Sequence, residues 1–244
     1  FGVPTPALLL YEGDQESRHG RAIEKVRDLE NRLSEIHAKK ISHWKTGGDP
    51  PTDSLPVPPK PDHSFGLEGD QEGVMGKATR CNGDDEVIVE GVPEFSRFDP
   101  FTMSVWVKPA VSQPRMLVLH QSVAAEDSAF RGLQLTIDDG KPELSRIHFW
   151  PGDAVRVEST EAIPCDRWSL LTIRHDGSGK AAGLDIYVNG SRVETAVERD
   201  HLTRDIRHRK EWNDLKVGMV KMALGARFRD IGFRDGLVDD LQIF

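Results

Sequence analysis

Two stretches decide the fold of this chain: residues 101–108 read FTMSVWVK, and residues 132–138 read GLQLTID. In both stretches apolar and polar side chains alternate. Successive side chains of a β-strand point to opposite faces, so this alternation predicts strands with one face in a core. A helical face would instead repeat after about 3.6 residues, and neither stretch shows that repeat.

The residues around these stretches continue the same pattern. From residue 64 onward, β-rich runs are separated by turn signals, and Asn189-Gly190 between two such runs predicts a type I′ hairpin. About a dozen short strands without helices between them predict a mainly β fold, with two antiparallel sheets forming a jelly-roll sandwich over 64–244 and no helix longer than two turns. The charged stretch 199–214 is expected to be a long surface loop. The other runs lie at 86–89, 115–120, 147–150, 154–157, 168–175, 184–188, 222–226 and 237–244.

One helical pattern precedes the β-rich part. Within the N-terminal segment 1–46, apolar residues recur at spacings of four and three residues, at Ala22, Val26, Leu29, Leu33 and Ile36. This spacing predicts one amphipathic α-helix over 18–44, with the last four of these residues on a buried face against a neighbouring domain. A homodimeric or intramolecular helical hairpin is the alternative. Residues 47–63 are rich in proline and predict an extended linker.

The composition excludes several classes of protein. The 244 residues carry a formal net charge of −8, which disfavours a nucleic-acid partner because phosphates require a basic face. No apolar run approaches the roughly 18 residues of a membrane-spanning helix. The two cysteines exclude a disulfide scaffold and a cysteine-based metal site. Cys81 is expected to be a buried free thiol, and Cys165 lies in a predicted turn. The chain lacks an initial Met and stops within an apolar alternation, so we expect a piece of a larger protein.

Three blocks of sequence resemble one family. Residues 76–87 read GKATRCNGDDEV, residues 168–190 read WSLLTIRHDGSGKAAGLDIYVNG, and residues 236–244 read GLVDDLQIF. In this order they resemble the opening, central and closing motifs of laminin-G-like, concanavalin A-like lectin/glucanase jelly rolls. The resemblance covers 64–244 and implies a concanavalin A-like jelly roll.

A narrower resemblance concerns residues 147–152, which read IHFWPG, and the stretch that begins at Arg199. Both are similar to the version of this domain found in large exported planctomycete proteins. The resemblance implies an exported module, periplasmic or at the cell surface, whose partners include flanking domains of its parent protein. The family's usual aromatic residue after His120-Gln121-Ser122 is absent here, which weakens any ligand site in that loop.

The family includes β-glucanases, so catalysis has to be considered. Those enzymes resemble one another in a Glu-x-Asp-x-x-Glu strand, whose alternation supplies the separation that a nucleophile and an acid need at the scissile bond. This chain has no such strand. Its nearest candidates, Asp239 and Asp240, are adjacent and therefore point to opposite faces. No H-E-x-x-H or G-x-S-x-G motif occurs either. We therefore expect no enzyme activity from this chain, and a glycoside hydrolase is the least favoured interpretation.

The resemblance also implies one metal, a structural calcium ion, because concanavalin A-like jelly rolls often bind Ca²⁺ through loop carboxylates and carbonyls. Asp84, Asp85 and Asp239 lie in the first and last blocks, which occupy neighbouring strands in this fold. The alternative is that Asp84 and Asp85 belong to an ordinary turn and that Asp239 caps local backbone.

A ligand site needs aromatic and planar polar side chains that the core does not use. Trp150 is the leading candidate, since an indole can lie on the apolar face of a sugar while neighbouring groups donate hydrogen bonds. Trp106 and Trp168 are assigned to the core, which is also the alternative for Trp150. The candidate donors are His148, His120, Arg115 and Arg227, with Arg131 and Arg229 as further possibilities.

The sequence therefore predicts a non-catalytic recognition module with carbohydrate as the leading ligand class. That last step rests on analogy with the fold. The alternative is a structural spacer, or an intramolecular docking domain for flanking modules with no soluble ligand.

Overall fold

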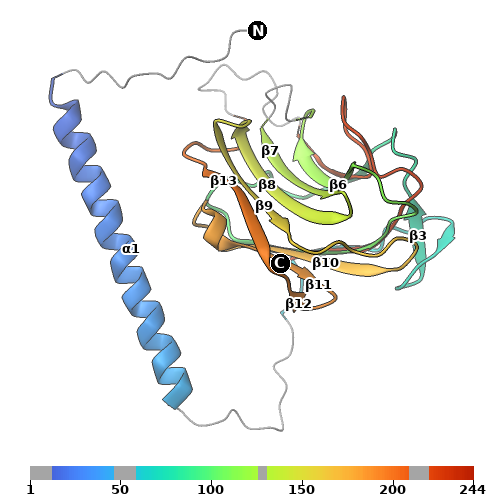
Figure 1. Ribbon diagram of the computed structural model, residues 1–244, viewed down its shortest axis with the longest axis horizontal. Coiled ribbons are helices and arrows are strands. Elements are labelled where there is room, and N and C mark those ends of the chain that lie inside the picture. The colour runs from blue at the N-terminus through green and yellow to red at the C-terminus, as the bar shows by residue number, and fades with distance from the viewer. Residues whose placement is uncertain (1–12, 47–58, 126–130, 209–219) are drawn as a thin grey trace. The chain divides into compact units, whose positions relative to one another are not determined.

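The computed structural model describes residues 13–46, 59–125, 131–208 and 220–244. The chain divides into two units between Pro58 and Pro59, within the predicted linker. The first unit contains the helix α1, Gln15–Thr46, and the second contains all the described strands (Figure 1). Residues 47–58 of the predicted linker lie outside the described residues.

Helix α1 covers the predicted helix and begins earlier, where the Arg18 amide donates to the carbonyl of Asp14 at 3.0 Å. Taken by itself, the helix leaves Val26 and Leu29 54% and 52% exposed, and their burial against a neighbouring domain stays a prediction. A lone amphipathic helix has no apolar surface of its own to cover its stripe. The side chains of Leu33 and Ile36 lie outside the described residues. In the described part of the chain, no helix combines the length and apolarity needed to cross a bilayer.

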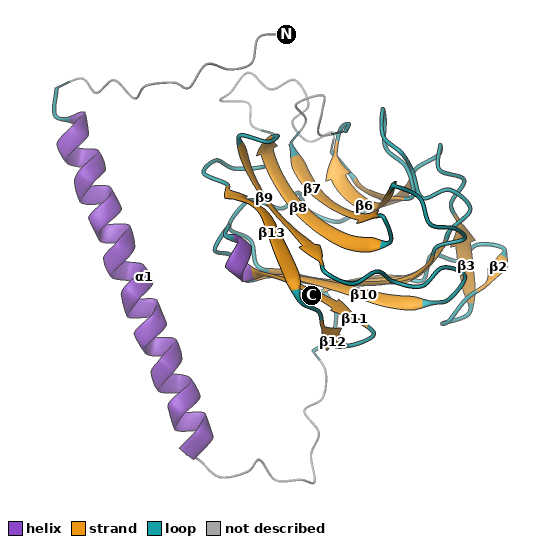
Figure 2. Cartoon of the chain, viewed as in Figure 1, coloured by secondary structure: helices purple, strands orange, loops and turns teal. Residues whose placement is uncertain are grey.

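The second unit is a sandwich of two antiparallel sheets, as the sequence predicts (Figure 2). One sheet has eight strands in the order β12-β11-β10-β5-β15-β3-β2, with β1 also paired to β15. Between residues 59 and 244, the described segments contain no helix beyond a single 3₁₀ turn, Ala181–Gly183. The strands of this sheet are β1 (His63–Phe65), β2 (Gln71–Glu72), β3 (Lys77–Arg80), β5 (Phe101–Lys108), β10 (Ser169–His175), β11 (Leu184–Val188), β12 (Ser191–Arg192) and β15 (Leu237–Ile243).

The other sheet has seven strands in the order β13-β9-β8-β7-β6-β14-β4, so β13 and β4 form its edges. Most neighbours in the centre of this sheet are consecutive in the sequence and are joined as hairpins. The strands are β4 (Val87–Val89), β6 (Arg115–Ser122), β7 (Gly132–Asp138), β8 (Lys141–Phe149), β9 (Asp153–Ser159), β13 (Thr195–His201) and β14 (Met222–Leu224).

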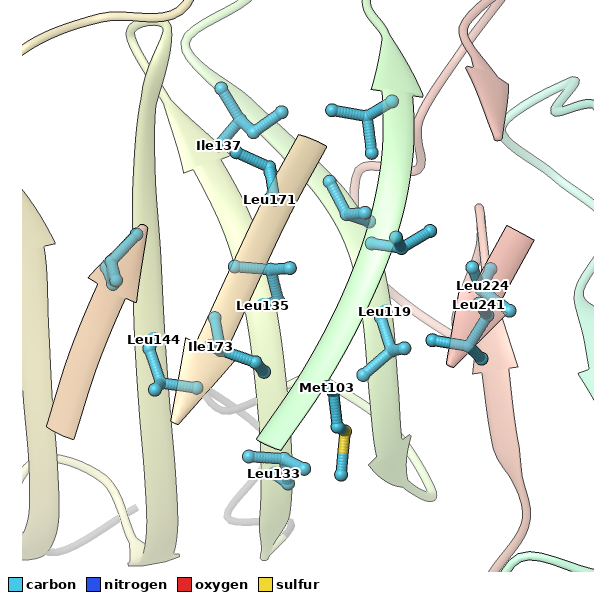
Figure 3. Close-up of a cluster of buried hydrophobic side chains, with 14 of the residues drawn as sticks. Met103, Leu119, Leu133, Leu135, Ile137, Leu144, Leu171, Ile173, Leu224 and Leu241 are labelled. Carbon is cyan, nitrogen blue, oxygen red and sulfur yellow. The ribbon is translucent and has the colours of Figure 1, made fainter. Parts of the chain in front are cut away.

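The core lies between the two sheets and is filled by alternate side chains of their strands. Met103 and Val105 of β5 are each 2% exposed, and Figure 3 shows Met103 among apolar side chains that include Leu135 of the other sheet. Trp106 follows Val105 and points the opposite way, so it is only partly buried. Trp168 is also partly buried and lies outside the core cluster. Assigning these two tryptophans to the core was therefore wrong.

The turns follow the sequence signals more closely than the charged stretch does. Asn189 and Gly190 have φ values of 50° and 81°, and Val188 pairs with Ser191 across the predicted hairpin. The expectation of a long surface loop over 199–214 is wrong in its first half. β13 extends to His201, and the segment that follows it buries Leu202 and Ile206. Charged side chains surround these two buried apolar residues in the sequence. The composition of the stretch therefore predicted a loop and gave no sign of their burial.

Two glycines allow a matched test of this packing. Gly132 has φ 145°, and a Cβ there would overlap the carbonyl oxygen of Gln121. Gly190 has φ 81° but no neighbouring atom within 4 Å. We expect Gly190→Ala to lower the free energy of unfolding by about 1 kcal/mol, the cost of a left-handed conformation alone. Gly132→Ala should lower it by more than about 3 kcal/mol because a backbone overlap is added. Urea unfolding of both variants measures the difference, and equal losses would contradict the packing described here.

Candidate functional site

A row of polar side chains crosses the outer face of the seven-stranded sheet in register. Arg199 of β13 lies opposite Arg156 of β9, Arg156 opposite Ser145 of β8, Ser145 opposite Gln134 of β7, and Gln134 opposite His120 of β6. On β9 and β7, the residues on both sides of Arg156 and Gln134 belong to the core between the sheets. This row therefore points away from the core. We call it the polar row.

Most of the polar row is buried although it faces away from the core. Arg156 is 5% exposed, and Ser145 and Gln134 are 0% and 1% exposed. Arg156 Nε donates to Ser145 Oγ at 2.8 Å and forms an ion pair with Glu143 Oε1 at 3.2 Å, while its Nη1 pairs with Glu198 Oε2 at 3.3 Å. A buried guanidinium needs such partners because desolvation of an unpaired charge is costly.

Trp150 lies over one end of the polar row. It follows β8, in the turn that leads to β9, and is partly exposed. The guanidinium carbon of Arg156 lies 3.6 Å from the centroid of the indole, and that of Arg199 lies 5.6 Å away. Cation–π stacking of this kind holds an aromatic ring in one orientation. The structure therefore places Trp150 outside the core, and its contact with a ligand stays a prediction.

The predicted donors Arg227 and Arg115 lie toward the other end of the polar row, and their donors are already used. Arg227 donates to Ser122 Oγ at 2.7 Å and to Gln134 Oε1 at 2.9 Å, and it pairs with Asp230. Arg115 Nε pairs with the same Asp230 at 3.0 Å. These two arginines and the neighbouring His120 are therefore brought together, but in a cluster separate from Trp150. The arginines hold the segment 226–231 against the sheet.

Neither predicted histidine is available as a donor. His120 is 1% exposed, and its Nδ1 and Nε2 lie within hydrogen-bonding distance of the carbonyl oxygens of Ser122 and Ala226. Burial, and then the charge of Arg227, lower the pKa of His120 to about 4. His148 Nδ1 lies 2.7 Å from the carbonyl oxygen of Asp205, and burial lowers its pKa. Both histidines act as buried structural groups. Of the further candidates, Arg131 is partly exposed and Arg229 is exposed.

The three carboxylates predicted to bind calcium are not brought together. The described residues contain no group of three or more His, Cys, Asp or Glu side chains that could hold a metal ion. Asp84 pairs with Arg234 at 3.4 Å, and Asp85 accepts a hydrogen bond from Asn82 Nδ2 at 2.8 Å. These three side chains therefore do not fit one common calcium site, and calcium binding by this chain stays a prediction.

Asp239 is the exception among these carboxylates because it is fully buried. Its Oδ2 accepts hydrogen bonds from the amides of Val74 and Met75 at 2.6 and 2.9 Å, and its Oδ1 has no hydrogen-bond partner among the described residues. It thus ties the loop between β2 and β3 to β15. This is the capping role that the sequence analysis gave as the alternative.

The cysteines have no role at the site. Cys81 is 1% exposed and Cys165 is partly exposed, and both are free thiols. Burial raises the pKa of Cys81 to about 12, so its thiol stays protonated and unreactive. The prediction of a buried free thiol at Cys81 is confirmed.

Sequence reasoning missed Arg156, Arg199 and Glu143, which surround or support Trp150. Arg156 alternates with Val155 and Val157, so its position on the outer face could have been inferred from that pattern. The pairing of Arg199 with Arg156 could not, because the segment containing Arg199 was interpreted as a loop. Register between strands is a long-range property that local patterns do not carry.

Comparison with known proteins agrees with this fold. A family model described as "Concanavalin A-like lectin/glucanases superfamily" matches residues 82–244. The chain belongs to this superfamily. None of the curated proteins matches it.

Solved structures are similar to this superfamily member at low sequence identity. The CBM40 of the Ruminococcus gnavus IT-sialidase, bound to α2,3-sialyllactose, has a TM-score of 0.50 and 12% identity over 68% of this chain and 89% of that one. Domain 4 of a GH43 extracellular arabinanase from Geobacillus stearothermophilus, in complex with arabinotriose, has a TM-score of 0.49 and 21% identity over 74% and 80%. Domains LG4-5 of mouse laminin α1 have a TM-score of 0.47 and 11% identity over 78% and 46%.

The buried histidines generate a pH dependence of stability. Burial, and then the charge of Arg146, also lower the pKa of His175 to about 4. An unfolded histidine titrates at about 6.5, so below that pH the unfolded chain binds protons that the folded chain does not. Stability should thus be intact above pH 6.5 and should fall by about 2–3 kcal/mol per histidine by pH 4.5. Urea unfolding measures this loss.

His120→Gln should flatten the dependence of the free energy of unfolding on pH, whereas His201→Gln at an exposed position should not. A profile that stays level from pH 7 to 4.5 would contradict the burial of these rings.

Asp239 offers a second test of the site's framework. We expect Asp239→Ala to lower the free energy of unfolding by about 2–4 kcal/mol, because two backbone amides lose a charged acceptor. Asp84→Ala removes only an exposed ion pair and should cost less than about 1 kcal/mol. Thermal and urea unfolding of the two variants compare these losses, and a similar small loss for both would refute the bridging role of Asp239.

Proposed function

We propose that this chain is a carbohydrate-binding module whose ligand contacts Trp150 at the end of the polar row. The observation that carries the proposal is the stack of Trp150 on Arg156, with Arg199 beside it. It presents a partly exposed indole on a fixed support. The superfamily and the glycan-bound structures of similar fold make a glycan a reasonable ligand class, but the proposal depends on this geometry.

The arrangement suits a sugar for a physical reason. A pyranose ring has an apolar face of C–H groups and a rim of hydroxyls, so it combines an aromatic contact with planar hydrogen-bonding partners. Arg199 is exposed beside the indole and supplies a donor, and Glu198, which is also exposed on β13 and contacts Arg156, supplies an acceptor. Because Arg156 already fixes the ring, binding costs little side-chain entropy.

We propose that the module is non-catalytic. Glycoside hydrolysis needs one carboxyl to donate a proton and a second to act as nucleophile or base. Near Trp150, Glu143 and Glu198 both form ion pairs with the same Arg156. Oε1 of Glu143 also accepts hydrogen bonds from Thr136 and Ser145 at 3.0 and 3.4 Å. These interactions use the carboxylates as counter-ions of Arg156 and not as an acid and base pair.

An exported location and attachment to flanking domains belong to the same proposal, as the sequence resemblance implies. The alternative function is structural docking between modules. It is favoured by the exposed apolar side chains of Ile23, Val26 and Leu29 on α1, which are 45%, 54% and 52% exposed. A protein that binds no glycan but associates through this helix would support that alternative.

A pair of tryptophan variants tests the proposal. Binding of the full chain is first screened on a glycan array, and affinity for the best ligand is then measured by calorimetry. We expect Trp150→Ala to weaken binding at least about tenfold, since it removes the stacking platform. Trp106→Ala is the matched control, because Trp106 is also partly buried but lies on the other sheet. Its affinity should stay within about twofold of the unmodified chain.

The same preparations distinguish binding from catalysis. We expect no reducing sugar to be released from a panel of β-glucans. Turnover that disappears in Asp239→Asn or Asp240→Asn would restore the glucanase interpretation. Equal affinities of the two tryptophan variants would show that the ligand does not contact Trp150. If the chain binds no glycan, the docking function becomes the favoured interpretation.

A further inference from the structure

Two arginines face each other directly across neighbouring strands at the proposed site. Arg199 of β13 is the register partner of Arg156 of β9, and both guanidinium groups lie over or beside the indole of Trp150. Like charges directly opposite each other in a sheet repel and destabilise the pairing. The buried charge of Arg156 must therefore be compensated within the protein, whereas the exposed charge of Arg199 is solvated and open to a ligand.

Arg156 is compensated within the chain by its ion pairs with Glu143 and Glu198. Arg199 is not. It is exposed, and its one side-chain hydrogen bond among the described residues runs from Nη1 to the backbone carbonyl of Glu198 at 2.7 Å. It has no carboxylate partner in the described part of the chain. By contrast, two arginines in the segment after β13, Arg204 and Arg207, pair with Asp153 and Asp205.

The geometry points to an acidic sugar as the ligand of this site, with Arg199 as the contact for its anionic group. This inference rests on the proposed function, because it names the ligand class of the same site. A guanidinium presents parallel N–H donors that match the oxygens of a carboxylate or a sulfate in a bidentate pair. With the sugar ring against Trp150, a carboxylate or sulfate beside Arg199 would act as the counter-ion that Arg199 lacks among the described residues.

The overall charge of the chain makes this inference discriminating. A net charge of −8 repels polyanions at long range, so general electrostatic attraction cannot produce a preference for acidic glycans. Any such preference has to come from a local contact. Arg199 is the only arginine at the indole that has no carboxylate partner in the described residues.

Matched glycan pairs test the inference on the full chain. The probes are an oligouronide with its carboxyl-reduced neutral form, and a sulfated oligosaccharide with its desulfated form. Calorimetry should show the acidic member of at least one pair bound about tenfold more tightly or better. A preference in the first pair alone assigns the carboxylate, and a preference in the second pair alone assigns the sulfate. Either result supports the proposal.

Two variants identify the contact. Arg199→Gln should abolish the preference, so that the acidic and the neutral member of a pair bind within about twofold of each other. Arg204→Gln removes the same charge from a nearby side chain that is 69% exposed and paired with Asp153, so it should keep the preference. Circular dichroism of both variants checks that the fold is retained.

The outcomes separate this inference from the proposed function. If neutral and acidic members bind equally and binding still depends on Trp150, the acidic specificity is wrong and the carbohydrate-binding function stands. A preference that survives in Arg199→Gln also overturns the inference. If no member of either pair binds and the glycan array is empty, both the inference and the proposed function fall.

Discussion

Charged side chains on the outer face of the seven-stranded sheet are largely buried, and the structure depends on the ion pairs and hydrogen bonds that stabilise them. Arg156 is the centre of these interactions. Its guanidinium joins Glu143 from the next strand, Glu198 from the edge strand and Ser145 directly opposite, and it carries the indole of Trp150. One buried cation thus links three strands to the aromatic ring on which recognition is proposed to depend. Its removal would leave Glu143 buried without its counter-ion, a strongly unfavourable state.

The fold could be predicted from the sequence because its main signal is local. The alternation at 101–108 and 132–138 has the same bounds as β5 and β7, since each strand has one face in the core and its pattern records that fact. The Asn189-Gly190 turn was predictable for a similar reason. β13 was missed because, as an edge strand with nearly all side chains exposed, it has no apolar alternation to reveal it.

The site was less predictable than the fold. Trp150 could be selected as an aromatic residue in a turn outside the strong strand patterns. The donors chosen beside it were wrong for His120, Arg115 and Arg227, because their hydrogen bonds to Ser122, Ala226 and Asp230 join segments far apart in the sequence. The actual neighbours of the indole, Arg156 and Arg199, come together through strand register. Residue type alone does not show whether a side-chain hydrogen-bond donor is available to a ligand or already bonded within the protein.

The position of Arg199 on β13 has a consequence for solubility. An edge strand exposes unpaired backbone groups that can template pairing with another chain. The run Glu198-Arg199-Asp200-His201 places four consecutive polar side chains, three of them charged, along that edge, and Val197 beside them is 58% exposed. The residues proposed to offer hydrogen bonds to a ligand thus also disfavour edge-to-edge pairing of the sheet with a second copy. A substitution that alters the proposed ligand contact on this strand therefore also has to keep the edge charged.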